Sequence, residues 1–125
     1  MQPGKGPVMP HPISTPDDMN RLDWNVNVEF KLKYVYDAIT LTRHKLEGKC
    51  PLIGFAGAPW TLMNYMIEGG SSTTSSKSKK WLYCNKEASH EFLTKLTTVV
   101  CKFLLEQVKA GAQLLQVTVI LLLTL

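Results

Sequence analysis

The most informative stretch of the 125-residue chain reads Gly54-Phe-Ala-Gly-Ala-Pro-Trp-Thr-Leu-Met-Asn-Tyr-Met-Ile-Glu-Gly69. It overlaps a short apolar run, 51–55, which has turn residues on both sides and is typical of a buried strand. A tight connection of Gly, Ala and Pro residues follows over 56–59. Residues 60–68 are then predicted to form a helix that Gly69 ends. The stretch therefore predicts a strand, a short loop and a helix, in that order.

The rest of the chain adds helices and a second strand. Apolar residues recur at helical spacing over 27–47 and again near 86–110, and a glycine follows each segment. Leu114 onward has the composition of another buried strand. Residues 1–24 are rich in proline and predict a loop or an extended lead-in, and 71–78 predict a polar loop or a weak helix start.

This order of elements contains a β–α–β unit, which favours a parallel sheet with helices outside it. We therefore predict an α/β fold. A sheet this small has unpaired edges, which indicates a part of a larger fold.

Composition and charge argue against several classes of protein. Fourteen Lys and Arg against ten Asp and Glu leave a formal charge of +4, and such scattered basic residues do not indicate nucleic-acid binding. Neither uncharged stretch, 50–67 or 110–125, predicts a membrane span, because Pro and Gly interrupt the first and the second is shorter than about 20 apolar residues. Cys50, Cys84 and Cys101 form no CxxC pair, so we expect buried or idle thiols in a reducing compartment.

Several side chains in the strand, loop and helix are candidates for function. Gly54 and Gly57 remove side chains where the strand turns into its loop, which allows a ligand to approach the backbone closely. Tyr65 has a phenol that can donate to a carboxylate, although a tyrosine on an apolar helix is more commonly a core residue. Phe55 is expected to be a buried strand residue, and its packing is compatible with contact to a substrate. Glu68 is expected to find a partner in the loop that follows.

The basic residues and the histidines give weaker signals. Lys77, Lys79 and Lys80 form a short cluster beside the Ser/Thr loop, which is most simply a solvated face, with phosphate binding as the alternative. The three histidines have no partner at the spacing of a catalytic triad or a metal site, so we expect them at the surface; they are His11, His44 and His90. No metal site is predicted.

The 54–69 stretch resembles the strand–loop–helix signature of the uroporphyrinogen decarboxylase family. The resemblance covers about residues 1–116 and includes the segments 4–7, 38–43, 80–83, 88–90 and 110–113. It implies a (β/α)₈ barrel that works as a homodimer in the cytoplasm. The family removes the four acetate carboxyl groups of uroporphyrinogen to give coproporphyrinogen, in haem and porphyrin biosynthesis, without a metal ion or an organic cofactor. On the family's pattern, Phe55 packs against the macrocycle and Tyr65 forms a hydrogen bond near the reacting acetate.

The same resemblance implies that some functional residues of the family have no counterpart here. The catalytic Asp and the Arg segment that grips the substrate carboxylates would lie upstream of Met1, and the family's downstream His is missing. A substrate-binding Ser would fall near Ile120, but the sequence has left the family pattern by Val117. We therefore expect 1–125 to be a partial domain, an incomplete TIM barrel of two to three βα units with a divergent apolar tail at 117–125. We expect it to be inactive by itself, because it lacks groups that would stabilise charge and orient carboxylates.

Two alternatives remain open. Barrel methyltransferases of the same superfamily are similar around the strand–loop–helix, but they bind zinc through His and Cys, and the sequence shows no such cluster. In the second alternative, the chain is a truncated, non-catalytic product that associates with an intact barrel subunit. Open sheet edges and an apolar tail favour such association.

Overall fold

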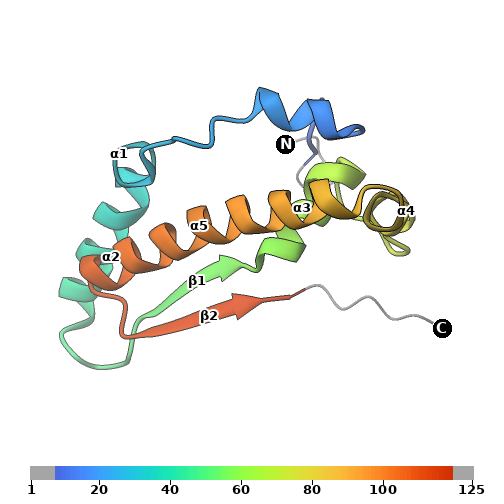
Figure 1. Cartoon of the computed structure of the whole chain (residues 1–125). Coiled ribbons are helices and arrows are strands. Elements are labelled where there is room, and N and C mark those ends of the chain that lie inside the picture. The colour runs from blue at the N-terminus through green and yellow to red at the C-terminus, as the bar shows by residue number, and fades with distance from the viewer. Residues whose placement is uncertain (1–7, 120–125) are drawn as a thin grey trace.

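A computed structural model of the chain describes residues 8–119 (Figure 1). The N-terminal part of this range contains a 3₁₀ helix and two α-helices: η1 (Pro16–Arg21), α1 (Val28–Lys31) and α2 (Lys33–Leu46). The remainder contains β1 (Ile53–Gly57), α3 (Pro59–Glu68), α4 (Ser76–Cys84), α5 (Lys86–Ala110) and β2 (Leu114–Thr118). The described chain therefore combines helices with two strands that helices connect, as the predicted α/β class requires.

The two strands form a parallel sheet, as the order of elements predicts. Ile53 pairs with Leu114 and Gly57 pairs with Thr118. Helices α3, α4 and α5 connect the strands, and α5 runs along one face of the sheet (Figure 1). The β–α–β unit is therefore confirmed.

The prediction that both strands are buried is wrong for the described chain. On β1, Gly54 and Ala56 are buried while Ile53 and Phe55 are exposed, and β2 is exposed over its whole length. Side chains alternate between the two faces of a strand, and α5 packs mainly on the β1 half of one face. The apolar runs that predicted burial thus leave one face of this small sheet open.

The predicted helix over 27–47 is divided at Leu32. Leu32 leaves the helical conformation with φ −109° and ψ 18°, so that α1 and α2 are separate. In one straight helix, residues 28 and 36 would lie about 80° apart around the axis. The break allows Val28 and Tyr36 both to be buried, and the Tyr36 phenol donates to the Val28 carbonyl oxygen at 3.4 Å.

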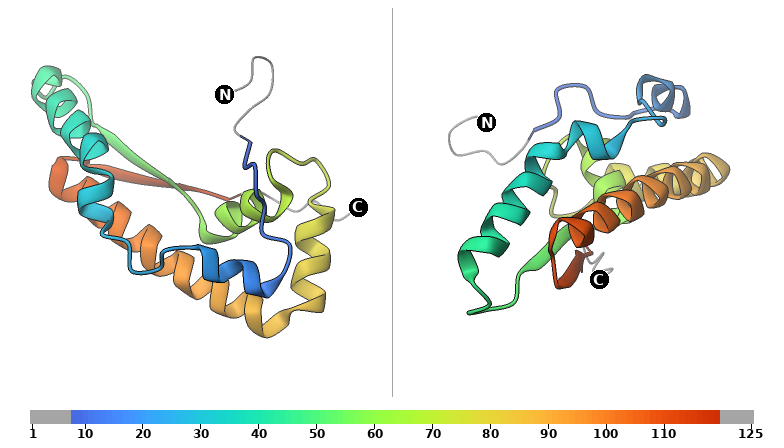
Figure 2. Two further views of the ribbon diagram at one scale, coloured as in Figure 1. Left: turned by 90° about the horizontal axis from the view of Figure 1, so that it is seen from above. Right: turned by 90° about the vertical axis from the view of Figure 1, so that its left-hand side faces the viewer.

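The N-terminal segment packs against the helices and is not a plain extended lead-in. Pro16 begins η1, and the Asp18 carboxylate accepts the amides of Ser14 and Thr15, each at 2.9 Å. These backbone hydrogen bonds are the main reason that the pKa of Asp18 lies below its ordinary value. Figure 2 shows this segment lying along α5 before it reaches α1.

The main hydrophobic core lies between this segment and the helices, and not under the sheet. Phe92 of α5 is at its centre, with the Trp81 ring 6.1 Å away and the Trp24 ring 5.7 Å away in an edge-on arrangement. The other buried members of the core are Ile13, Met19, Met63, Ile67 and Leu96. The N-terminal segment therefore holds α3, α4 and α5 together.

Helix α4 was expected only as a weak helix start within a polar loop. It begins at Ser76 because a carboxylate from the preceding helix supplies its first turn with an acceptor. The Glu68 Oε1 atom accepts the Ser78 amide at 2.9 Å and the Ser78 hydroxyl at 3.1 Å. Glu68 therefore has a partner, as predicted, but Ser78 lies in the first turn of α4 and not in a loop.

Two surface predictions have different outcomes. The three histidines are exposed, as expected. The three cysteines are free and exposed, so they are not buried, and the alternative that they are idle thiols stays a prediction. Within residues 8–119 no helix combines the length and the apolar character that a membrane span needs.

Candidate functional site

The carboxyl ends of β1 and β2 lie together at the point where α3 begins. The Ala58 amide donates to the Thr118 carbonyl oxygen at 2.9 Å, and the Thr61 hydroxyl donates to the same oxygen at 3.0 Å. Pro59 occupies the first turn of α3, where its missing amide leaves no donor unpaired. The loop between β1 and α3 is thereby fixed to the end of the neighbouring strand. In open α/β sheets and in barrels, ligands bind at this end of the strands.

Phe55 presents its side chain to the open face of the sheet. The ring is 58% exposed, so the predicted burial of this residue is wrong in the described chain. It points away from α5, because Gly54 faces α5 and side chains alternate along a strand. Ile53 and its partner Leu114 lie on the same face as Phe55. This apolar face is accessible for contact.

Gln107 of α5 holds the backbone of Phe55, and the sequence did not predict it. Its side chain is 2% exposed. Its Oε1 accepts the Phe55 amide and its Nε2 donates to the Phe55 carbonyl oxygen, each at 2.9 Å. The Leu52 carbonyl and the Ala58 amide form hydrogen bonds with β2. Because successive residues of a strand direct their backbone groups to opposite edges, the amide and the carbonyl of Phe55 point to the edge of β1 that faces away from β2. Gln107 therefore pairs with that edge as a neighbouring strand would. The sequence signal available for Gln107 was its position seven residues after the buried Val100, which places both residues on the same face of one helix.

Gly54 makes this contact possible. A Cβ atom at position 54 would lie 2.9 Å from Gln107 Oε1 and 2.9 Å from the Leu115 side chain. The space that the missing side chain of Gly54 leaves is thus taken up by Gln107 and Leu115, and close approach of a ligand to this backbone stays a prediction. At Gly57 a Cβ would meet the Leu62 side chain at 3.2 Å, and a ligand contact there stays a prediction.

Tyr65 lies on α3 at an apolar groove. Its side chain is 36% exposed, and the groove, ≈450 Å³ in volume, runs between α3 and the N-terminal segment. Leu62, Met66 and residues 8–10 complete most of its wall. Phe55 does not line this groove, so the described chain does not bring the two predicted substrate contacts into one hollow.

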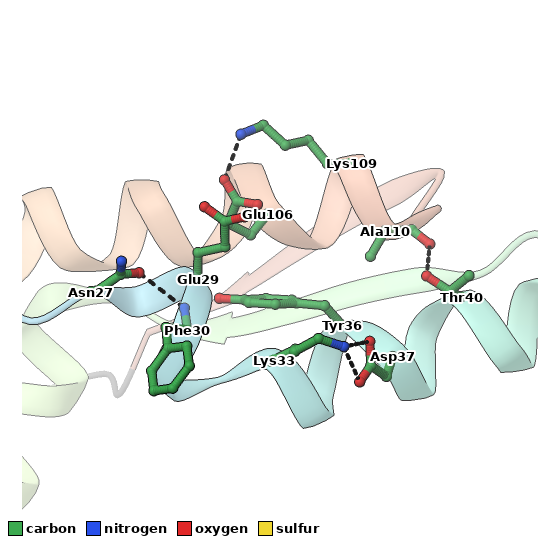
Figure 3. Close-up of a pocket in the computed structure, with 10 residues that line it drawn as sticks. All are labelled: Asn27, Glu29, Phe30, Lys33, Tyr36, Asp37, Thr40, Glu106, Lys109 and Ala110. Carbon is green, nitrogen blue, oxygen red and sulfur yellow. Dashed lines mark hydrogen bonds and ion pairs between the residues drawn. The ribbon is translucent and has the colours of Figure 1, made fainter.

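A second hollow, ≈490 Å³, lies between α1, α2 and the last turns of α5 (Figure 3). Its most buried side chain is Tyr36. Burial raises the pKa of Tyr36, and the nearby carboxylates of Glu106 and Glu29 raise this pKa further. Lys109 donates to Glu106 at 2.6 Å, which raises the pKa of Lys109.

This second hollow is at the wrong end of the strands for the predicted site. The Thr40 hydroxyl donates at 2.9 Å to the carbonyl oxygen of Ala110, the last residue of α5 before the chain turns into β2. The hollow therefore lies toward the amino ends of the strands, where barrel residues usually serve stability. Among residues 8–119 no group of three or more His, Cys, Asp or Glu side chains is placed to hold a metal ion.

A parallel β–α–β unit whose strand ends carry a tight loop and a helix defines an α/β protein of the kind that binds ligands above its sheet. Comparison with protein families makes the assignment specific. Residues 1–120 match the family model described as uroporphyrinogen decarboxylase (URO-D). The chain belongs to the uroporphyrinogen decarboxylase family. The matched region ends slightly beyond Val117, where we expected the similarity to stop.

Curated relatives agree with this family. The chain is 63% identical over 117 residues to the uroporphyrinogen decarboxylase of Danio rerio, which covers 94% of this chain and 32% of the relative. It is 57% identical over 117 residues to that of Dictyostelium discoideum, with the same coverage. It is 53% identical over 116 residues to that of Homo sapiens, covering 93% of this chain and 32% of the relative. The chain therefore spans about a third of the length of the curated relatives it matches.

Proposed function

We propose that this chain supplies a β–α–β portion, two to three βα units, of a (β/α)₈ barrel that decarboxylates uroporphyrinogen to coproporphyrinogen. Membership of the family supports the reaction. The observation that carries the proposal is the fixed junction of β1, β2 and α3, where the Ala58 amide and the Thr61 hydroxyl share the Thr118 oxygen. Active sites of barrels are built at this end of the strands. In this proposal residues 1–125 are part of one domain, and the enzyme is a cytoplasmic homodimer.

The chemistry assigns separate roles to the two predicted contacts. Loss of carbon dioxide from an acetate arm leaves negative charge that a proton donor must take up, and the other carboxylates must be held in place. Phe55 is open on the sheet face and supplies an apolar surface for the macrocycle. Tyr65 keeps a partly exposed phenol that can donate to a substrate carboxylate. Gly57 leaves the end of β1 without a side chain.

The test is Tyr65→Phe in the active enzyme that contains these residues. A hydrogen bond to a charged group contributes roughly 1.5–3 kcal/mol, so kcat/KM for uroporphyrinogen should fall about 10- to 100-fold. Tyr83→Phe is the matched control, because Tyr83 is 79% exposed on α4 and lines neither the groove nor the sheet face. Equal kcat/KM values for Tyr65→Phe and the unmodified enzyme would remove Tyr65 from the site.

The 125 residues by themselves should not convert uroporphyrinogen. On the family pattern that the sequence resembles, the catalytic Asp and the carboxylate-gripping Arg are not matched among these residues, so we expect neither charge stabilisation nor orientation to be complete. Incubating the purified chain with uroporphyrinogen and separating the products tests this directly. Any coproporphyrinogen above the rate of a heat-denatured control would contradict it.

A second role is favoured by one specific observation. Ile53, Phe55 and Leu114 form an exposed apolar face on the sheet. Such a face favours association of the chain with an intact barrel subunit without catalysis of its own. Recovery of the tagged chain in a complex with full-length enzyme is the expected result; a dispersed monomer that never co-purifies would contradict it.

A further inference from the structure

Phe55 occupies a part of β1 that packing and strand pairing fix only weakly. The residue is largely exposed on the open face of the sheet, so few side chains hold its ring. Its neighbours along the strand are Gly54 and Ala56, and a glycine inside a strand leaves the backbone more freedom. The ladder with β2 uses the backbone groups of the residues on either side, because those of Phe55 point to the other edge. The position of this ring therefore depends on a further contact.

The side-chain amide of Gln107 supplies that contact. It accepts the Phe55 amide and donates to the Phe55 carbonyl oxygen, each at 2.9 Å. Two hydrogen bonds of opposite direction from one planar amide fix both the place and the orientation of the backbone that they hold.

Gln107 is itself held in place. Its side chain is buried, and its backbone carbonyl oxygen accepts the Ala112 amide at 3.0 Å, where the chain turns from α5 toward β2. The same helix is anchored in the main core by Phe92 and Leu96. The amide therefore connects Phe55 to the most firmly packed helix of the described chain.

We propose that Gln107 is a positioning residue for substrate binding, which holds Phe55 where its ring meets the macrocycle. This inference rests on the proposed function, in which Phe55 packs against uroporphyrinogen. Gln107 lies on the α5 side of the sheet, opposite the open face, so it acts through Phe55 and does not touch the substrate. In the enzyme, the strand beside this edge of β1 leaves the two backbone groups of Phe55 to Gln107. A small displacement of a contact residue is enough to weaken the binding of a rigid ligand.

The first test is Gln107→Met in the active enzyme that contains these residues, because methionine has a similar length but neither bonds the Phe55 amide nor its carbonyl as glutamine does. An apolar contact with the macrocycle is present in the ground state and in the transition state, so its loss raises KM and leaves kcat nearly unchanged. We expect KM for uroporphyrinogen to rise about tenfold and kcat to stay within about twofold. A purely structural role would lower the amount of folded enzyme, and with it the apparent kcat, without raising KM.

A double-mutant cycle tests whether Gln107 acts through Phe55. Phe55→Ala removes the ring, so there is no longer a contact for Gln107 to position. Adding Gln107→Met to Phe55→Ala should therefore change KM by no more than about twofold, whereas independent effects of the two substitutions would multiply.

Two further variants complete the design. Gln113→Met is the matched control, because the Gln113 side chain also bonds the backbone near β1, accepting the Leu52 amide at 3.2 Å, but not at Phe55. Its KM should stay within about twofold of the unmodified enzyme. Gly54→Ala keeps Gln107 but displaces it, since the new Cβ would lie 2.9 Å from Gln107 Oε1. Its KM should rise as in Gln107→Met.

Circular dichroism establishes that each variant is folded. If Gln107→Met is not, Gly54→Ala decides, because the atoms that must give way there include the ends of two flexible side chains, those of Gln107 and Leu115. An unchanged KM in the folded variant, multiplied effects in the cycle, or an equal rise in Gln113→Met would each overturn the positioning role. The proposed substrate contact is tested separately by Phe55→Ala. If that variant keeps the KM of the unmodified enzyme, the contact at Phe55 fails and the positioning role fails with it. If Phe55→Ala raises KM and Gln107→Met does not, the positioning role alone fails.

Discussion

The side-chain amide of Gln107 occupies backbone groups of Phe55 that a neighbouring strand would otherwise pair. Both hydrogen bonds are 2.9 Å long, and the amide is nearly inaccessible to water. Free strand edges are sites of unwanted pairing, and proteins protect them in several ways. Here a helix that packs on the sheet face reaches the edge with one side chain, and Gly54 provides the space for it.

Gln107→Leu should destabilise the chain by about 1–3 kcal/mol, because it leaves a partly buried amide and carbonyl of Phe55 without partners. Urea denaturation followed by circular dichroism measures the change. Gln113→Leu is the matched control. Its Oε1 accepts the Leu52 amide at 3.2 Å, but this bond is exposed and water can replace it, so we expect about 0.5 kcal/mol or less. Equal losses in the two variants would show that the Gln107 amide does not protect the edge.

Single residues were predictable where their chemistry is local. The partner of Glu68 lies ten residues further on and was expected from the helix-end carboxylate alone. The exposure of Phe55 was not predictable in this way, because an apolar strand residue is buried only if another element covers its face. The role of Gln107 depends on a residue 52 positions away, and no local pattern contains that information.

Among the elements, α4 depends most on a contact from outside itself. Glu68 is the last residue of α3, where a carboxylate opposes the partial negative charge of the helix end. The same carboxylate accepts two hydrogen bonds from Ser78 in the first turn of α4. It therefore satisfies donors at the start of one helix at some cost to the end of another.

Glu68→Leu should cost about 1–2 kcal/mol and loosen α4 selectively. Hydrogen exchange should accelerate at the amide of Ser78. The amides in the middle of α5 should lose only the protection that follows from the lower global stability. Glu91→Leu is the control, since it removes a carboxylate from an exposed pair with Lys95 and should change stability by less than about 1 kcal/mol. Unchanged exchange at Ser78 in Glu68→Leu would contradict the capping role.

The elements that the sequence predicted well are those with strong periodicity or clear end signals. The spacing of apolar residues and the following Gly111 predicted α5, and Pro59 and Gly69 bounded α3. The polar first turn of α4 concealed a helix that tertiary contacts stabilise. The break at Leu32 was hidden because both halves of 27–47 share the same apolar spacing, and only packing against α5 separates them.

For the whole molecule, the strongest physical constraint is the uneven covering of the sheet. The core gathers between the N-terminal segment and helices α3 to α5, while the face bearing Ile53, Phe55 and Leu114 stays open. The chain spans about a third of its relatives' length. In the proposed barrel this face is turned to the interior, and the same face in the separate chain is available for association.

The 125-residue chain should therefore self-associate as its concentration rises, and sedimentation velocity measures this. Ile53→Lys should weaken association about tenfold or more, because burial of an isoleucine side chain contributes roughly 1.5–3 kcal/mol and a lysine on this face opposes contact. Leu41→Lys is a matched control, since Leu41 and Ile53 are each 57% exposed but Leu41 lies on α2, away from the sheet face. If association runs through the sheet, only Ile53→Lys disperses it. A chain that sediments as a monomer throughout, or that both variants disperse equally, would show that the open face does not drive assembly.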